Sequence, residues 1–87
     1  MHKLKPSDEF KKGLKKLSSK EQKQTAAKLE LFRENPFHPS LRTKKVKGLK
    51  GVFEMSVNMD IRILWKYHKG ALLLLIAIGH HKEILGS

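Results

Sequence analysis

The spacing of apolar residues near the beginning of the chain is helical. Three of them recur at i, i+4 and i+7 and would lie on one face of a helix: Phe10, Leu14 and Leu17. Ser7 is a candidate N-cap for this helix, because the acidic residues Asp8 and Glu9 follow it and favour the positive end of the helix dipole. A short strand at 2–4, ended by Pro6, would precede the helix.

A second helix is predicted directly after the first. Ser18 and Glu21 have the spacing of a capping box, and Pro36 ends the helix because the residue before a proline avoids helical angles. The apolar stripe of this helix comprises Thr25, Leu29 and Phe32, with Ala26, Ala27 and Leu31 beside it. The short connection at 17–18 predicts an antiparallel helical hairpin, in which Gly13 costs the first helix up to about 1 kcal/mol relative to Ala. Residues 37–40 are expected to form a loop.

The apolar period then changes from helical to alternating, which is typical of strands. The expected strands are Lys44 to Lys47, Val52 to Val57, Ile61 to Tyr67 and Ala71 to Ile78, with turns at 58–60 and 69–70. Ile61, Ile63, Trp65 and Tyr67 would share one face, so both aromatic residues are interpreted as core. The order β-α-α-β-β-β-β predicts an α+β fold, a single domain at 1–87 with the helical hairpin packed on one face of a small, mostly antiparallel sheet.

Charge narrows the classes of partner. The 87 residues include 19 Lys and Arg against 8 Asp and Glu, a net charge of +11. This balance favours contact with nucleic acid, an anionic membrane surface or an acidic protein, and an inert charged surface is the alternative. The longest apolar run has eight residues, far fewer than the roughly 20 of a membrane-spanning helix. Without cysteine there is no disulfide framework or thiolate zinc site, and without an apolar leader the expected location is the cytoplasm.

Two segments of the chain resemble a known family. KVKGLKGVFEMSVNMDIRILWKY and LLLIAIGHHKEIL, with the opening HKLKPSDEFKKGLKKL, are similar to the RelE/ParE superfamily of bacterial toxins and in particular to its YafQ-like branch. The resemblance implies the fold above and a toxin of a type II toxin–antitoxin module. It also implies a metal-independent endoribonuclease that cleaves mRNA on the ribosome, inhibits translation and is silenced by a cognate antitoxin. It implies no cofactor. Asp60, Arg62 and His81 match positions that the family links to cleavage or substrate contact.

The chain also departs from the family pattern at several positions. Ser56 stands where YafQ-like members have a histidine, Ala77 where an arginine often precedes the terminal glycine, and Leu85 where an aromatic residue is common. Lys44 and Lys45 stand near another family histidine. These differences favour two alternatives: a ParE-like toxin that inhibits DNA gyrase without nuclease activity, or a decayed domain that only binds RNA or an antitoxin.

The candidate catalytic residues are His81, Arg62, Asp60 and Lys45. Histidine titrates near neutral pH and can act as general acid or base, although an exposed histidine without a task is the alternative. The planar guanidinium of Arg62 matches phosphate oxygens, unless it instead forms an ion pair with Asp60 or Glu54 across the sheet. Asp60 at a turn can equally serve local hydrogen bonds to the backbone.

Lysines dominate the expected RNA surface. The candidate RNA-binding residues are Lys44, Lys47, Lys50, Arg42, Lys66 and His80, beside the catalytic Lys45. Phosphate contacts of this kind give affinity that depends on salt with little choice of sequence, and the alternative is a solvated edge strand in which lysines oppose aggregation. The lysines of the first helix, among them Lys12 and Lys16, are interpreted as its solvated face. No metal site is predicted, because the adjacent His80 and His81 would point apart on a strand and have no acidic cluster or cysteine beside them.

Overall fold

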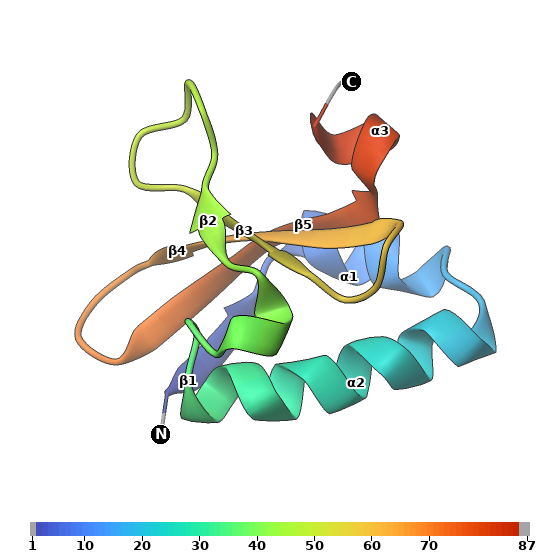
Figure 1. Ribbon diagram of the computed structural model, residues 1–87, viewed down its shortest axis with the longest axis horizontal. Helices are drawn as coiled ribbons and strands as arrows, with labels where there is room; N and C mark the ends of the chain where they lie inside the picture. The colour runs from blue at the N-terminus through green and yellow to red at the C-terminus, as the bar shows by residue number, and fades with distance from the viewer. Residues whose placement is uncertain (1, 86–87) are drawn as a thin grey trace.

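The structure is a computed structural model, and it describes residues 2–85. Its elements, labelled in Figure 1, are β1 (Lys3–Pro6), α1 (Asp8–Lys15), α2 (Ser19–Glu34), the 3-10 turn η1 (Pro39–Leu41), β2 (Lys44–Lys45), β3 (Phe53–Ser56), β4 (Ile61–Tyr67), β5 (Leu72–His80) and α3 (His81–Leu85). Within residues 2–85, no helix has the length and apolar character needed to cross a membrane.

Five strands form one sheet in the order β1-β5-β4-β3-β2. β1 is parallel to β5, and all the other neighbours are antiparallel. Figure 1 shows α1 and α2 on one side of the sheet, while α3 and the segment between β2 and β3 rise on the other side. This arrangement confirms the predicted α+β fold, with a helical hairpin on one face of a mostly antiparallel sheet.

Local hydrogen bonds begin both long helices as the sequence predicts. The Ser7 hydroxyl accepts the Phe10 N–H at 3.0 Å, and it donates to the carbonyl of Ile76 at 2.6 Å. Ser18 and Glu21 form a reciprocal capping box, with distances of 2.9 and 3.1 Å between each backbone nitrogen and the opposite side-chain oxygen. Because the Glu21 carboxylate accepts the Ser18 backbone N–H, its pKa lies below the ordinary value.

A β-bulge divides β5 into two parts. Trp65 pairs with Leu75 whereas Leu64 pairs with Ala77, so Ile76 is an extra residue on this strand. Before the bulge, Leu75 belongs to the core; after it, Ile78 does. The bulge therefore shifts the alternation by one residue and turns Ala77, which pairs with Leu64, toward the face without the helical hairpin.

The core lies between this sheet and the helical hairpin. Trp65 and Phe32 are fully buried, and their rings meet edge to face with centroids 4.9 Å apart. Leu41 directly follows the loop predicted at 37–40. It is the last residue of η1 and is also fully buried. Tyr67 is 45% exposed, so its assignment to the core was wrong. It lies at the end of β4 and packs edge to face on Trp65 and Phe53 instead.

Several predicted boundaries also need correction. β1 continues through Pro6, which an edge strand tolerates because the missing N–H is not needed there. β2 ends at Lys45 rather than Lys47, and Val52 precedes β3 instead of opening it. β5 extends to His80, and α3 follows at once, a helix that the sequence reading did not include.

Gly13 marks the closest approach of α1 to the sheet. A Cβ atom at this position would lie 2.3 Å from the carbonyl oxygen of Ile78, a backbone atom in β5. No side chain fits in that space without movement of the helix or the strand. The residue that weakens the isolated helix therefore permits the packing of α1 on β5.

Gly13→Ala is expected to destabilise the protein by about 1–3 kcal/mol, the usual cost of overpacking, although Ala is the better helix former. Chemical denaturation measures the change in the free energy of unfolding. Lys11→Ala, an exposed substitution on the same helix, is the control and should stay within about 0.5 kcal/mol. A gain in stability for Gly13→Ala would contradict the close contact with Ile78.

Candidate functional site

The face of the sheet opposite the helical hairpin carries charged residues in register. Lys44 pairs with Glu54, Glu54 with Leu64, and Leu64 with Ala77, so these four side chains form one row across the sheet. Ser56 pairs with Arg62, which pairs with Gly79, and this forms the next row. We call this surface the open face. The segment 46–52 and α3 stand at its two sides in Figure 1.

Arg62 is bound to the turn that joins β3 and β4. Its Nη1 donates to the carbonyl oxygens of Asn58 at 2.7 Å, Met59 at 3.0 Å and Ile61 at 3.2 Å. The Asn58 side chain completes this turn, since its Oδ1 accepts the N–H groups of Asp60 and Ile61, each at 2.8 Å. The side chains of Asn58 and Arg62 thus both bind the backbone of the turn, and these bonds restrain the position of the Arg62 guanidinium.

Glu54 is the acidic group beside Arg62. Its side chain is only 9% exposed, and its Oε1 lies 3.9 Å from both Arg62 Nε and Lys44 Nζ. Of the two ion pairs considered for Arg62, the one with Glu54 is present. Asp60 forms no ion pair in the described part of the chain, and Asn58 rather than Asp60 makes the side-chain hydrogen bonds to the turn backbone.

Arg62→Gln is expected to lower the free energy of unfolding by about 3 kcal/mol, because it leaves the buried Glu54 carboxylate with only the exposed Lys44 nearby. Adding Glu54→Gln removes the unpaired charge, so the double variant should regain part of the lost stability. A double-mutant cycle by chemical denaturation measures this coupling. Strict additivity of the two substitutions would show that the ion pair has no energetic role.

A hollow of about 530 Å³ gathers four of the sequence-predicted residues. Asp60, Arg62, His80 and His81 line it, together with Met59, Lys82 and Glu83. The backbone N–H of His81 donates to the carbonyl of Asp60 at 2.8 Å, which ties the start of α3 to the β3–β4 turn. We call this the histidine hollow. Residues separated by about twenty positions in the chain meet there because the last pair of the β4–β5 ladder is Ile61 with His80.

The helix α3 explains the geometry of the two histidines. They do not alternate along one strand, as the sequence reading assumed, because β5 ends at His80 and α3 begins at His81. Gly79 lies under the helix, where a Cβ atom would meet Ile84 Cγ2 at 2.8 Å. Lys82 and Glu83 enter the hollow through this helix and were missed as site residues. The side chain of Leu85, a departure from the family pattern, lies outside the described part of the molecule.

The predicted lysines divide between different surfaces. Lys44 lies on the open face, but Lys45 pairs with Phe53 and therefore belongs to the opposite face. Lys45 and Lys50 instead line a hollow of about 710 Å³ with the half-exposed Leu49. Lys66 pairs with Leu74 and is exposed, and Lys47 is exposed in the segment after β2. The structure does not bring Lys45 into the histidine hollow.

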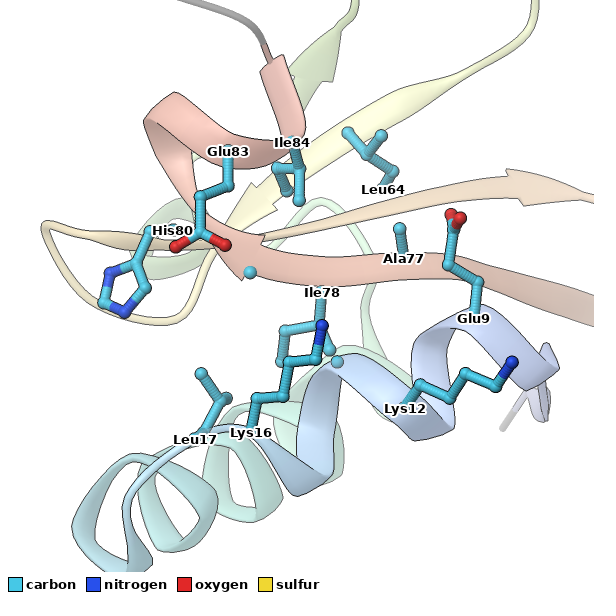
Figure 2. A pocket seen from close by; sticks show the side chains of 12 residues that line it. Glu9, Lys12, Lys16, Leu17, Leu64, Ala77, Ile78, His80, Glu83 and Ile84 are labelled. Atoms are coloured by element: carbon cyan, nitrogen blue, oxygen red, sulfur yellow. The ribbon is translucent and has the colours of Figure 1, made fainter.

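A third hollow, of about 690 Å³, runs between α1, the end of β5 and α3 (Figure 2). Lys12 of α1 and Lys16, which caps the end of that helix, line one side of the hollow. Glu83 extends from α3 toward β5, and His80 lies at the end of that strand. Ala77 and Leu64 provide apolar surface between these charges. The lysines of α1 interpreted as a solvated face thus also border a groove whose walls carry both signs of charge.

Metal ligation finds no support in the described residues. Within residues 2–85, no group of three or more His, Cys, Asp or Glu side chains is close enough to hold a metal ion. His80 and His81 are accompanied in the histidine hollow by Asp60 and Glu83, but these do not form such a group. The histidine hollow places two imidazoles beside a guanidinium held by the β3–β4 turn, which suits proton transfer next to an anion.

The fold has close counterparts among solved structures, although no protein-family model and no curated protein matches the sequence. YafQ from E. coli strain BL21(DE3) has a TM-score of 0.79 and 18% identity, over 99% of this chain and 100% of YafQ. RelE in the archaeal RelE–RelB complex from Pyrococcus horikoshii OT3 has a TM-score of 0.76 and 12% identity, over 91% and 93%. A metal-bound toxin from Helicobacter pylori has a TM-score of 0.69 and 25% identity, over 97% and 99%.

The chain therefore has the fold of the RelE/ParE toxin superfamily, with YafQ among the structures that it resembles. This confirms the resemblance drawn from the basic segment, the β3–β4 turn and the terminal histidines. Two further structural counterparts were solved as complexes, namely the DinJ–YafQ complex and the RelBE toxin–antitoxin complex of E. coli.

Proposed function

We propose that this protein is the toxin of a type II toxin–antitoxin module and a metal-independent endoribonuclease that cleaves mRNA on the ribosome. The observation that carries the proposal is the histidine hollow, in which Asp60, Arg62, His80 and His81 converge at one end of a strongly basic sheet. The toxin fold supports the biological class, and the chemistry of these side chains supports RNA cleavage.

The proposed reaction is an internal transfer at phosphorus. The 2′-oxygen of one nucleotide attacks the adjacent phosphorus as a base removes the 2′ proton, and the bond from phosphorus to the 5′-oxygen breaks as an acid protonates that oxygen. The products are a 2′,3′-cyclic phosphate and a free 5′-hydroxyl. The His81 imidazole is the first candidate for proton transfer, and Asp60, which is exposed and has no side-chain hydrogen bond in the described residues, is the second.

Cations are needed for the negative charge that accumulates on the phosphate oxygens. Arg62 supplies a fixed positive charge, since its hydrogen bonds to the turn restrain it before any substrate arrives. Lys44 shares the open face with Arg62 and takes the electrostatic role first expected of Lys45. The further lysines, namely Lys45, Lys47, Lys50 and Lys66, and His80 are proposed to bind RNA phosphates away from the scissile bond.

The proposed protein partner is a cognate antitoxin. Structural counterparts of this chain include toxins solved in complex with antitoxins. A chain with a net charge of +11 attracts an acidic segment, and the groove between α1, β5 and α3 combines apolar surface with charged walls that such a segment can follow. An antitoxin there would also reach Glu83 and His80, which border the histidine hollow as well.

A ParE-like inhibitor of DNA gyrase, or a domain that only binds RNA or an antitoxin, is the second candidate. The observation in its favour is the structural engagement of Arg62, whose Nη1 is shared among three carbonyls and whose Nε faces Glu54. Ser56 and Ala77, which stand near Arg62 on the open face, add no imidazole or guanidinium there.

His81→Ala is expected to slow cleavage of ribosome-bound mRNA by about 10²- to 10⁴-fold, the usual contribution of positioned acid–base catalysis. The fold should persist, because the imidazole of His81 makes no hydrogen bond in the described residues. Primer extension on mRNA from a reconstituted translation reaction measures the rate. His68→Ala, which removes an exposed histidine from the β4–β5 turn, is the matched control and should cleave like the wild type.

Cleavage by the wild type should also continue after the protein is treated with EDTA. Magnesium free of other metals is added back, because the ribosome needs it to stay intact. Intact mRNA together with growth arrest and gyrase trapped on DNA would establish the ParE-like alternative. Equal rates for His81→Ala and His68→Ala would remove His81 from the chemistry.

An acidic or DNA-binding product of the adjacent gene is expected to bind this protein tightly, and the affinity should fall as salt rises because opposite charges attract the two chains. Titration calorimetry at several salt concentrations measures this. The double variant Lys12→Ala/Lys16→Ala should weaken the complex if the antitoxin binds the groove in Figure 2. Lys69→Ala, which removes a lysine from the β4–β5 turn outside the groove, is the control. No binding to the neighbouring product would count against a toxin–antitoxin pair.

A further inference from the structure

A smaller hollow, of about 270 Å³, shares Met59 and Arg62 with the histidine hollow. It is built from three separate parts of the chain: α2, η1 with the residue after it, and the continuous stretch from β3 through the β3–β4 turn to β4. The polar residues that line it are Lys28, Ser40, Arg42, Ser56, Asn58 and Arg62. We call it the cation hollow. Only Arg42 and Arg62 among these residues were expected to contact RNA.

The cation hollow has an excess of positive charge. Three cationic side chains line it and no acidic residue does, whereas the histidine hollow includes Asp60 and Glu83. Within residues 2–85, the side chains of Lys28 and Arg42 form no ion pair, and Arg62 forms one with Glu54. Like charges in a confined space repel one another, so an anion that enters would stabilise all three.

Arg42 occupies this place at a conformational cost. Its φ is 51°, and it is the only residue other than glycine with a positive φ in the described chain. The left-handed conformation is unfavourable for an ordinary side chain, and glycine or asparagine is the usual choice at the end of a helix. Here an arginine ends η1 instead and contributes its side chain to the hollow.

Hydrogen bonds hold one side of the cation hollow in place. Asn58 Nδ2 donates to Gln24 Oε1 at 2.8 Å, which fastens the β3–β4 turn to α2. Arg62 is held by the carbonyls of the same turn, and Ser40 Oγ lies 3.0 Å from His38 Nδ1. An anion would therefore find the Arg62 side of the hollow already in position, a condition that favours affinity.

We propose that the cation hollow binds a phosphodiester of the RNA strand, at a nucleotide neighbouring the scissile one. The assignment rests on the proposed function, because Arg62 connects this hollow with the histidine hollow where cleavage would occur. The hollow is lined by guanidinium groups, the ammonium group of Lys28 and the hydroxyl group of Ser56. Donors that come from different parts of the wall can each bind a different oxygen of one phosphate. The hollow would thus hold the strand in register while leaving the base unread.

Arg42→Asn and Lys28→Ala test the proposal. Asparagine tolerates a positive φ, so this substitution removes the charge without adding backbone strain. Fluorescence anisotropy with single-stranded RNAs of several sequences, at a series of salt concentrations, measures the affinity. Each variant should weaken all the RNAs similarly and reduce the slope of log K against log salt by about 0.7 per lost contact. Lys23→Ala, an exposed lysine on α2 outside the hollow, is the control and should keep the slope of the wild type.

Slopes for Arg42→Asn and Lys28→Ala that equal that of Lys23→Ala would overturn the proposal, and so would a wild type that binds no RNA. If the two variants retain RNA affinity but lose affinity for the antitoxin, the hollow holds carboxylates of a protein and the proposal is wrong. Cleavage is assayed separately on ribosome-bound mRNA by primer extension: a reduced slope in the variants without any such cleavage by the wild type supports the phosphate site and removes the nuclease function. The phosphate site and the nuclease function can therefore be refuted independently of each other.

Discussion

The path of β5 through the molecule is the constraint on which the other features depend. This strand lies between β1 and β4, and its bulge at Ile76 moves the apolar alternation from Leu75 to Ile78. The Ser7 hydroxyl accepts the Phe10 N–H in the first turn of α1 while donating to the carbonyl of Ile76, so one side chain links the start of the helix to the bulge. Without the shift, the small residues Ala77 and Gly79 would face the core rather than the open face.

The position of the candidate site follows from that shift. Gly79 leaves room for Ile84, so α3 can fold back over the sheet immediately after His80. The same end of β5 pairs with Ile61, which brings the β3–β4 turn beside the helix start and allows the His81 N–H to bond to Asp60. Packing on the opposite face of the sheet has a similar cause, because α1 can approach the Ile78 backbone of β5 only where Gly13 lacks a side chain.

Arg62 joins stability to the proposed chemistry. It closes the β3–β4 turn, faces the largely buried Glu54 and lines two hollows at once. A restrained guanidinium is useful in a site for anions, since its position need not change when charge develops. The same engagement means that lost activity in an Arg62 variant has two possible origins, and only a stability measurement on that variant separates them.

The sequence by itself determined the features that depend on nearby residues. The caps at Ser7 and at Ser18 with Glu21 involve spacings of three residues, and alternation identified the strands of the meander. The charge and motif pattern also indicated the class of fold that the structural comparisons support. These signals are local or compositional, and they do not depend on how distant segments meet.

The tertiary structure decided which of the candidate residues act together. Register placed Lys44 with Arg62 and turned Lys45 to the other face, a distinction that depends on a single residue of alternation in a strand of two residues. α3 was hidden because its few residues follow a strand without a turn signal, and it forms where Gly79 admits Ile84. Lys28 of α2 and Arg42 after η1 line the same hollow although fourteen positions separate them in the chain. Contacts between residues that are tens of positions apart depend on how the whole core packs. They therefore leave no short pattern in the sequence.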